Sequence, residues 1–251
     1  MIAKDLICAL DPVEFSRSVG ITPDPWQAEV LRYEGKRLLL NCSRQSGKST
    51  TTAVKALHVA LYQPKSLILL VSPSLRQSSE LFRKVKGNYE ALETRPALTE
   101  DNKLSMTLDN GSRVISLPSD SATVRGFSAV DLILFDEAAQ AADAFYYAIL
   151  PMLAVSGGSI IAMSTPYGKR GFFFHEWQDG GNSWTRIEIP ASECPRISPE
   201  ELERQRRSLG DMFFRQEFNC AFVETVDSVF NYDSVQAAFS SDVKPLFEGM
   251  G

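Results

Sequence analysis

The sequence predicts an α/β fold in which helices flank a mostly parallel central sheet. Short apolar runs indicate buried strands at Arg37–Asn41, Ser66–Val71, Val130–Phe135 and Ser159–Ser164. Segments with helical periodicity separate these runs, at about Ser49–Tyr62, Arg76–Leu92 and Ala141–Leu150. Strands that alternate with helices favour parallel pairing, which brings the carboxyl ends of the strands to one edge of the sheet. We therefore expect the functional site at that edge.

A helical segment precedes the first strand. After the turn-forming Thr22-Pro23-Asp24-Pro25, the residues Trp26, Val30 and Tyr33 recur at helical spacing on one face, while Gln27 falls off that face. This pattern predicts an amphipathic helix packed against the core.

Turn signals divide the rest of the chain. Gln63-Pro64-Lys65 ends the helix that follows the first strand, because proline disfavours further helical hydrogen bonding. Further on, Leu104–Leu108 and Arg113–Leu117 flank Asp109-Asn110-Gly111, a sequence typical of a hairpin turn. The aromatic run Phe172-Phe173-Phe174 is more typical of a core or a subunit contact than of a base-stacking platform.

The first apolar run leads into a small polar loop that closes like a phosphate-binding P-loop, with Gly47-Lys48-Ser49. In such a loop the backbone N–H groups wrap the phosphates, the lysine reaches the terminal phosphates and the serine hydroxyl binds Mg²⁺. A helix that begins near Ser49 also directs the positive end of its dipole at the anion. Cys42 replaces the usual first glycine of the motif. The candidate nucleotide-binding residues of the loop are Ser43, Arg44, Gln45, Ser46, Gly47, Lys48, Ser49 and Thr50.

A second motif supports the first, because the run that starts at Val130 ends in two adjacent carboxylates. Asp136 is expected to hold Mg²⁺ together with Ser49, and Glu137 to polarise the attacking water. Each motif has another explanation, since Gly-Lys-Ser also fits a surface turn and acids are favoured at helix N-termini. In this order, however, the two motifs predict a P-loop NTPase of the RecA/ASCE-like class, with ATP and Mg²⁺ as cofactors.

Composition agrees with a globular enzyme domain. The 251 residues are enough for one large α/β unit. A net charge of −5 argues against a protein that simply coats nucleic acid, although it leaves room for local DNA contact. No apolar segment approaches the roughly 20 residues that cross a bilayer, so we expect a cytoplasmic protein without a membrane. The four cysteines are scattered, which indicates neither a zinc site nor a disulfide framework.

Taken in order, the motifs resemble one family, the large terminase subunit that packages DNA into the heads of tailed phages. Terminases often lack the first P-loop glycine and carry an arginine inside the loop, as Arg44 does here. The resemblance extends from Pro25-Trp26-Gln27 to Phe230. It includes Leu108–Ser112 (LDNGS), Val124–Gly126 (VRG), Phe135–Ala139 (FDEAA) and the STPYGKRGFFFHEW segment from Ser164.

The resemblance implies further site residues. Trp26 and Gln27 look like an adenine-reading Q motif, although Trp26 is equally explained as a core residue. Arg44 would stabilise the γ-phosphate within the subunit, unless it faces solvent or pairs with an acid. Thr165 would touch the γ-phosphate or water, unless it only belongs to a strand-ending turn. Arg125 would act in trans as the arginine finger of a neighbouring subunit, or else form a structural salt bridge.

The resemblance also implies a domain organisation. Residues 1–35 would form the helical lead-in with the Q-like motif, 36–230 the ATPase core, and 231–251 a short tail or linker. Large terminases normally continue into a nuclease domain, and this chain ends about where that domain should begin. We therefore expect an excised domain or a truncated gene product, without nuclease activity.

The function predicted on these grounds is Mg²⁺-dependent ATP hydrolysis that powers translocation of double-stranded viral DNA into a procapsid, in the cytoplasm of the infected bacterial host. The resemblance implies double-stranded DNA, the portal protein and the small terminase subunit as partners, with a homo-oligomeric ring on the procapsid. Two alternatives remain. A superfamily 2 helicase-like ATPase fragment would need a second RecA-like domain, and a non-catalytic nucleotide-binding switch would not need Glu137.

Overall fold

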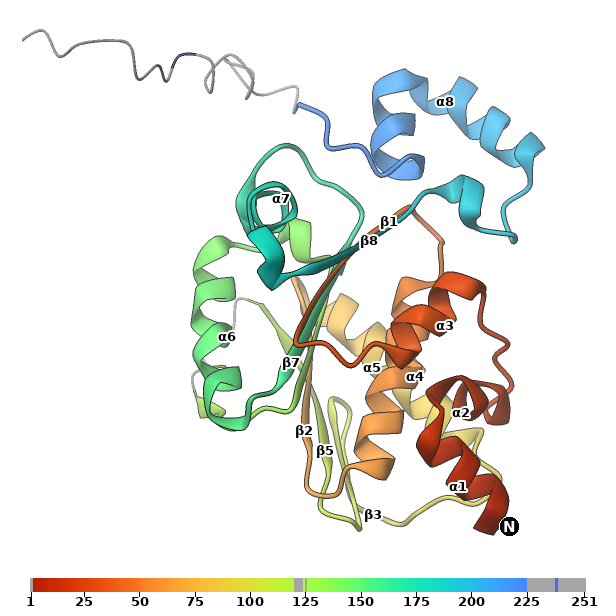
Figure 1. Cartoon of the computed structure of the whole chain (residues 1–251), viewed down its shortest axis with the longest axis vertical. Coiled ribbons are helices and arrows are strands. Elements are labelled where there is room, and N and C mark those ends of the chain that lie inside the picture. Colours follow the sequence, from red (N-terminus) through yellow and green to blue (C-terminus); the bar gives the residue numbers. More distant parts are fainter. Residues whose placement is uncertain (1, 120–123, 125, 225–237, 239–251) are drawn as a thin grey trace, which may run out of the picture.

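An eight-stranded sheet forms the centre of the computed structural model (Figure 1), which describes residues 2–119, 124, 126–224 and 238. The strands are β1 (Arg37–Cys42), β2 (Leu67–Ser72), β3 (Leu98–Asp101), β4 (Ser105–Leu108), β5 (Arg113–Pro118), β6 (Leu132–Asp136), β7 (Ser159–Ser164) and β8 (Thr185–Ile189). The α-helices are α1 (Ile2–Leu10), α2 (Pro12–Ser18), α3 (Pro25–Arg32), α4 (Lys48–Tyr62), α5 (Leu75–Glu90), α6 (Asp143–Ser156), α7 (Gly171–Gln178) and α8 (Pro199–Phe218). Short 3₁₀ turns lie at η2 (Ala138–Gln140), η3 (Gly181–Ser183) and η4 (Ala191–Glu193).

The order of the strands is β3-β4-β5-β2-β6-β7-β1-β8. From β5 to β8 all neighbours are parallel, whereas β3, β4 and β5 pair antiparallel at one edge. The mostly parallel sheet is therefore confirmed. The predicted hairpin is confirmed as well, because β4 and β5 pair across a turn in which Gly111 has a φ of 85°.

Helices cover both faces of the sheet, and alternate strand residues point to opposite faces. On one face Leu38 and Leu40 of β1 pack under α1 to α5, and on the other Leu39 packs with α6 and α7 (Figure 1). All three leucines are fully buried. Each contributes about 1.5–3 kcal/mol by the removal of its side chain from water, so the sheet is held from both sides.

Helix α6 extends further than the sequence indicated, to Ser156 instead of Leu150. It continues through Pro151 because Met152 and Leu153, which follow the proline, are buried against the sheet. It ends where Gly157 adopts a φ of 62° and donates its N–H to the carbonyl of Leu153.

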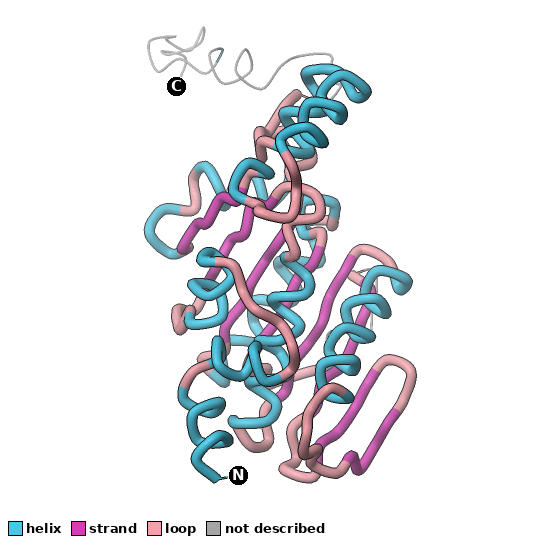
Figure 2. Tube along the Cα trace, turned by 90° about the vertical axis from the view of Figure 1, so that its right-hand side faces the viewer, coloured by secondary structure: helices cyan, strands magenta, loops and turns pink. Residues whose placement is uncertain are grey.

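Helix α8 lies at the opposite end of the molecule from the N-terminus, as the 90° view shows (Figure 2). The arginines of its Arg204–Arg207 run are exposed and pair with acids of the same helix, as expected for a solvated surface. The helix is kinked at Gly210, where φ is 75°.

Two further expectations concern burial. The aromatic residues of Phe172–Phe174 are at most 2% exposed, so this run belongs to the core as expected. Within the described part of the chain, every helix is too short or too polar to span a bilayer.

Candidate active site

Three neighbouring strands bring the two motifs together. β7 lies between β1 and β6, and all three are parallel. Asn41 near the end of β1 pairs with Ser164 at the end of β7, and Asp136 at the end of β6 pairs with Met163. The loop after β1 and the carboxylates after β6 therefore meet at the carboxyl edge, where ligand sites of parallel sheets are found.

The P-loop has the backbone conformation that its sequence suggests. Gln45 and Gly47 have positive φ values of 59° and 97°, and α4 begins at Lys48. A Cβ atom added to Gly47 would lie 2.8 Å from Nε2 of Gln27, too close for any real contact. Position 47 therefore requires glycine for two reasons, its left-handed backbone and the side chain above it.

The candidate catalytic residues form one cluster of charges. The Nζ atom of Lys48 lies 3.1 Å from Oε1 of Glu137. Ser49 donates a hydrogen bond of 2.8 Å from its hydroxyl to Oδ2 of Asp136. Lys48 and Asp136 are both buried, with 8% and 7% of their surfaces exposed. The cluster therefore combines one ammonium group with two carboxylates in a largely water-free environment.

Burial and the neighbouring charges act on both buried groups. Burial alone would lower the pKa of Lys48, but the carboxylates of Glu137 and Asp136 outweigh this effect and raise that pKa above its ordinary value. Burial raises the pKa of Asp136, with a further contribution from Glu137, while Lys48 and the Ser49 hydroxyl oppose the rise. The lysine therefore stays charged, and the carboxylate depends on the lysine for its own charge.

Glu137 stands in a strained conformation, with φ 52° and ψ 40°. For a residue other than glycine this conformation costs about 1–3 kcal/mol. The backbone N–H of Glu137 donates to Oδ1 of Asp136 at 3.0 Å. The turn lets two adjacent carboxylates point to different partners, Asp136 to Ser49 and Glu137 to Lys48.

The residues present fit a magnesium ion. The Ser49 hydroxyl and the Asp136 carboxylate are 2.8 Å apart and offer the hard oxygen ligands that Mg²⁺ prefers. Among the described residues no group of three or more His, Cys, Asp or Glu side chains could hold a metal. This donor set agrees with the usual mode of Mg²⁺ binding, in which one or two protein groups are completed by phosphates and water.

Arg44 lies on the outer side of the loop. Its guanidinium pairs with the carboxylate of Glu217 on α8, and its backbone N–H donates to the Glu217 carbonyl at 2.9 Å. The arginine side chain is 67% exposed, whereas that of Glu217 is 17% exposed. The pairing with an acid is thus the arrangement found, and the role of Arg44 toward a γ-phosphate stays a prediction.

The two residues of the Q-like motif have different surroundings. Trp26 is buried within the core cluster under α3 and α4, which agrees with its structural explanation. Gln27 was expected off the buried face, but it is only 5% exposed. Its Oε1 atom accepts from the N–H of Asp24 at 2.9 Å, so the side chain folds back over the start of α3, close to Gly47. Tertiary contact with the P-loop, rather than helical periodicity, buries it.

The remaining loop positions are structural as far as the contacts show. Cys42 is fully buried, and burial raises the pKa of its thiol to about 12, so it remains neutral where the usual motif has glycine. Ser43 is buried and its N–H donates to the carbonyl of Ile189 at 2.9 Å. Ser46 is also buried. The hydroxyl of Thr50 accepts a hydrogen bond of 3.3 Å from Lys84.

Two of the predicted catalytic residues lie outside this cluster of contacts. Thr165 is 6% exposed and directly follows Ser164, whose Oγ lies 3.4 Å from Oε2 of Glu137. Its position near the site is therefore established, and its contact with substrate stays a prediction. Arg125 falls outside the described residues, as do Phe230 and the tail at 231–237 and 239–251.

Three residues at the site were missed by the sequence analysis. Arg196 donates to the carbonyl of Ser46 at 2.6 Å. Lys84 was assigned to a solvated surface, yet its ammonium reaches Thr50, and desolvation lowers its pKa. Glu217 holds Arg44. None of them carries a sequence signal, because each meets the loop from a segment at least 34 residues away.

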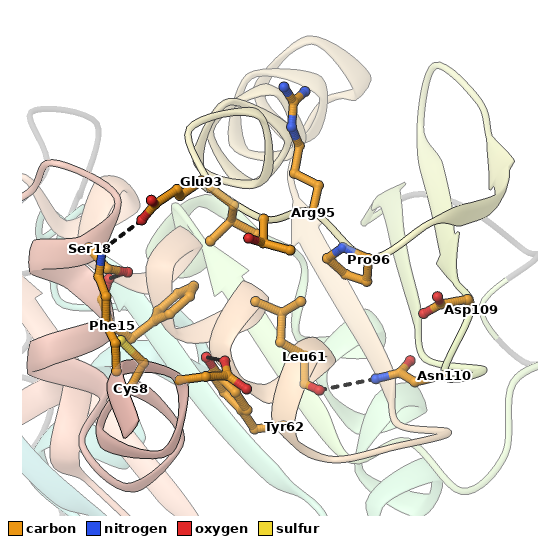
Figure 3. A pocket seen from close by; sticks show the side chains of 14 residues that line it. Cys8, Phe15, Ser18, Leu61, Tyr62, Glu93, Arg95, Pro96, Asp109 and Asn110 are labelled. Atoms are coloured by element: carbon orange, nitrogen blue, oxygen red, sulfur yellow. Dashed lines mark hydrogen bonds and ion pairs between the residues drawn. The ribbon is translucent and has the colours of Figure 1, made fainter. Parts of the chain in front are cut away.

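A separate cavity of about 820 Å³ lies at the other edge of the sheet (Figure 3). It is lined by α1, α2, the end of α4, the loop after α5 and the β4–β5 turn. Its polar groups satisfy one another, since Lys4 pairs with Glu93 at 2.8 Å and Tyr62 donates to Asp5 at 3.0 Å. The nucleophiles, acids and P-loop described above are all absent from its lining, so it is not the candidate active site.

Comparison with known proteins agrees with this site. A family model described as "Terminase large subunit, T4likevirus-type, N-terminal" matches residues 39–237. The terminase large subunit of Thermus phage G20c is 26% identical over 253 residues, which covers 87% of this chain and 52% of that protein. The chain thus spans about half the length of the curated relatives it matches.

Solved structures share the fold. The large terminase ATPase domain of Thermus phage P74-26 superposes with a TM-score of 0.74 at 22% identity, covering 84% of this chain and 98% of that chain. The large terminase of another thermophilic bacteriophage, in complex with ATP-gamma-S, superposes with a TM-score of 0.64 at 14% identity, covering 80% and 53%. With the family model matching most of its length, the chain belongs to the N-terminal family of the phage terminase large subunit, T4likevirus-type.

Proposed function

We propose that this chain hydrolyses ATP with the help of Mg²⁺, and that hydrolysis powers the movement of double-stranded DNA into a viral procapsid. One observation carries the first part. Lys48, Ser49, Asp136 and Glu137 converge within hydrogen-bond distance at the carboxyl edge of three parallel strands. Phosphoryl transfer asks a protein for this set of groups, which position the phosphates, hold the metal and orient water.

Substrate binding begins with the loop. Its backbone N–H groups and the dipole of α4 attract the phosphates, and Lys48 adds a full positive charge. Ser49 and Asp136 are the residues that would hold Mg²⁺. When bound, the ion neutralises charge on the terminal phosphates.

Glu137 prepares the water. Its carboxylate shares the ammonium of Lys48, and a phosphate oxygen that approaches Lys48 competes for the same charge. Release of Glu137 from this ion pair leaves a carboxylate that accepts a proton from water next to the γ-phosphate. Coupling of the general base to phosphate binding follows from this shared partner.

Membership of the terminase family supports the second part. The related P74-26 domain is named as an ATPase domain, and the second terminase structure is described in complex with ATP-gamma-S, which supports an adenine nucleotide as the substrate here. The portal protein, the small terminase subunit and a ring of identical subunits are the partners that DNA packaging requires. In that ring Arg125 would serve the site of a neighbouring subunit.

Phosphate release by the purified chain tests the proposal. With Mg²⁺ and ATP we expect turnover that requires the metal and that double-stranded DNA increases more than single-stranded DNA. Turnover stimulated only by single strands would favour the helicase-like alternative. Tight ATP binding without turnover, either alone or in a reconstituted packaging assay with procapsid and DNA, would favour the nucleotide-binding switch.

A further inference from the structure

Arg196 connects two parts of the proposed nucleotide site that are far apart in the sequence. It lies between η4 and α8, in the segment that follows β8. Its Nη2 atom donates to the carbonyl oxygen of Ser46 at 2.6 Å, and its Nη1 atom lies 2.8 Å from Oδ2 of Asp24. One guanidinium therefore contacts both the P-loop and the residue that caps α3.

The contact with Ser46 constrains the loop peptide that matters for phosphate binding. A peptide unit is planar, and its C=O and N–H point in opposite directions. The carbonyl of Ser46, held on the outer side by Arg196, therefore turns the N–H of Gly47 to the inner side. That N–H is one of the groups expected to wrap the phosphates.

The contact with Asp24 extends the constraint to the segment expected to read the adenine. The N–H of Asp24 donates to Oε1 of Gln27 at 2.9 Å. The Nε2 atom of Gln27 and the Nη2 atom of Arg196 both lie over Gly47, at 2.8 Å and 3.2 Å from the place of a Cβ atom there. Asp24, Gln27 and Arg196 thus surround the peptide before α4.

The guanidinium suits this task because its donors are arranged in a rigid fork. A lysine in the same place has one ammonium and holds one partner at a time with this geometry. The Arg196 side chain is 48% exposed, so its ion pair with Asp24 adds little to global stability. The contribution of Arg196 lies in the orientation of the loop.

We propose that Arg196 is a positioning residue for nucleotide binding, which holds the Ser46–Gly47 peptide in its phosphate-binding orientation and links it to Asp24. This inference rests on the proposed ATPase function. It assigns to Arg196 an effect on the phosphate part of the ligand, which a role limited to adenine contact would not produce.

Calorimetric titration with two ligands tests the proposal, with Mg²⁺ present. ATPγS carries the adenine, and tripolyphosphate lacks it. We expect Arg196→Ala to weaken the binding of both ligands by about tenfold or more, the loss typical of a hydrogen bond to a charged group. Asp24→Asn should keep tripolyphosphate binding within about twofold, because the contact of Arg196 with Ser46 remains. Arg204→Ala is the matched control, since this exposed arginine pairs only with Glu201 on α8 among the described contacts, and it should bind both ligands as the unmodified chain does.

Each other outcome is decisive. Unchanged tripolyphosphate binding by Arg196→Ala would overturn the inference, whether or not ATPγS binding falls. If Arg196→Ala is unfolded by circular dichroism, Arg196→Lys is read instead: recovery of tripolyphosphate binding by this single-point donor supports the role, and loss of both ligands by a folded Arg196→Lys equal to that of Lys48→Ala contradicts it. Absence of binding by the unmodified chain would reject the proposed function itself, a result distinct from binding that ignores Arg196.

Discussion

The Nζ atom of Lys48 and the Oε1 atom of Glu137 lie 3.1 Å apart, in a site where the lysine is almost fully buried. The cation expected to hold phosphate and the carboxylate expected to activate water are therefore partners of one another. Because each needs the other's charge in a poorly solvated place, removal of either affects both.

Lys48→Ala should reduce ATP turnover by about 100-fold or more, since an electrostatic donor aimed at the phosphates is lost. Asp136 and Glu137 would also be left without their cation, and their repulsion would disfavour a second anion. Phosphate release at saturating Mg²⁺ measures the effect. The control is Lys103→Ala, an exposed lysine near the β3–β4 turn. Near-normal turnover in Lys48→Ala would mean that the loop does not bind the phosphates.

Glu137→Gln should bind ATPγS within about threefold of the unmodified chain and hydrolyse ATP about 10²–10⁴ times more slowly, because an amide keeps the shape but accepts no proton. Calorimetry and single-turnover hydrolysis separate the two quantities. A variant that loses binding and hydrolysis to the same degree would show that Glu137 maintains the loop instead of activating water.

Asp136→Asn should act through the metal. The neutral amide retains a partner for Ser49, but we expect it to raise the Mg²⁺ concentration for half-maximal turnover by about tenfold or more, as a charged ligand is lost. Turnover measured over a series of Mg²⁺ concentrations tests this. Equal Mg²⁺ dependence in Asp136→Asn and Glu137→Gln would contradict the division of roles between the two acids.

Gly47→Ala should weaken nucleotide binding by about tenfold or more and destabilise the fold by about 1–3 kcal/mol, because the new Cβ meets Gln27 and the backbone has a φ of 97°. The matched control is Gly87→Ala in α5, where no atom lies within 4 Å of the added methyl group. That change should stabilise the fold by about 0.5–1 kcal/mol. Urea denaturation compares the two, and equal effects would refute the contact over Gly47.

Lys55 predicts a pH dependence of stability. It donates to the carbonyls of Leu31 and Tyr33 at the end of α3, and burial lowers its pKa from 10.5 to about 8. Between these values the unfolded chain binds more protons than the folded one, so the contribution of Lys55 to stability rises with pH. It is smallest below about pH 8 and complete above 10.5.

Lys55→Met, which does not titrate at this position, provides the comparison. The free energy of unfolding of the unmodified chain, minus that of Lys55→Met, should grow by roughly 1–3 kcal/mol between pH 7.5 and pH 10. Urea denaturation at several pH values measures it. A flat difference would show that the two carbonyls retain the proton despite burial.

The sequence by itself determined the strands, the P-loop, the β4–β5 hairpin and the pair Asp136-Glu137. These features depend on short-range rules, such as two-residue alternation in strands and the backbone freedom of Gly47 and Gly111, which a local pattern records. The order of the two motifs along a parallel sheet was then enough to predict that they meet at one edge.

Only the tertiary structure decided which distant groups support the site. Arg44 meets Glu217, Gln27 folds over Gly47, and Arg196 holds the carbonyl of Ser46, all across long stretches of chain. A hydrogen bond between residues 150 positions apart leaves no periodic trace, because its geometry is set by how the helices pack on the sheet. The chemistry of the site is therefore written locally in the sequence, whereas the orientation of its groups depends on the assembled fold.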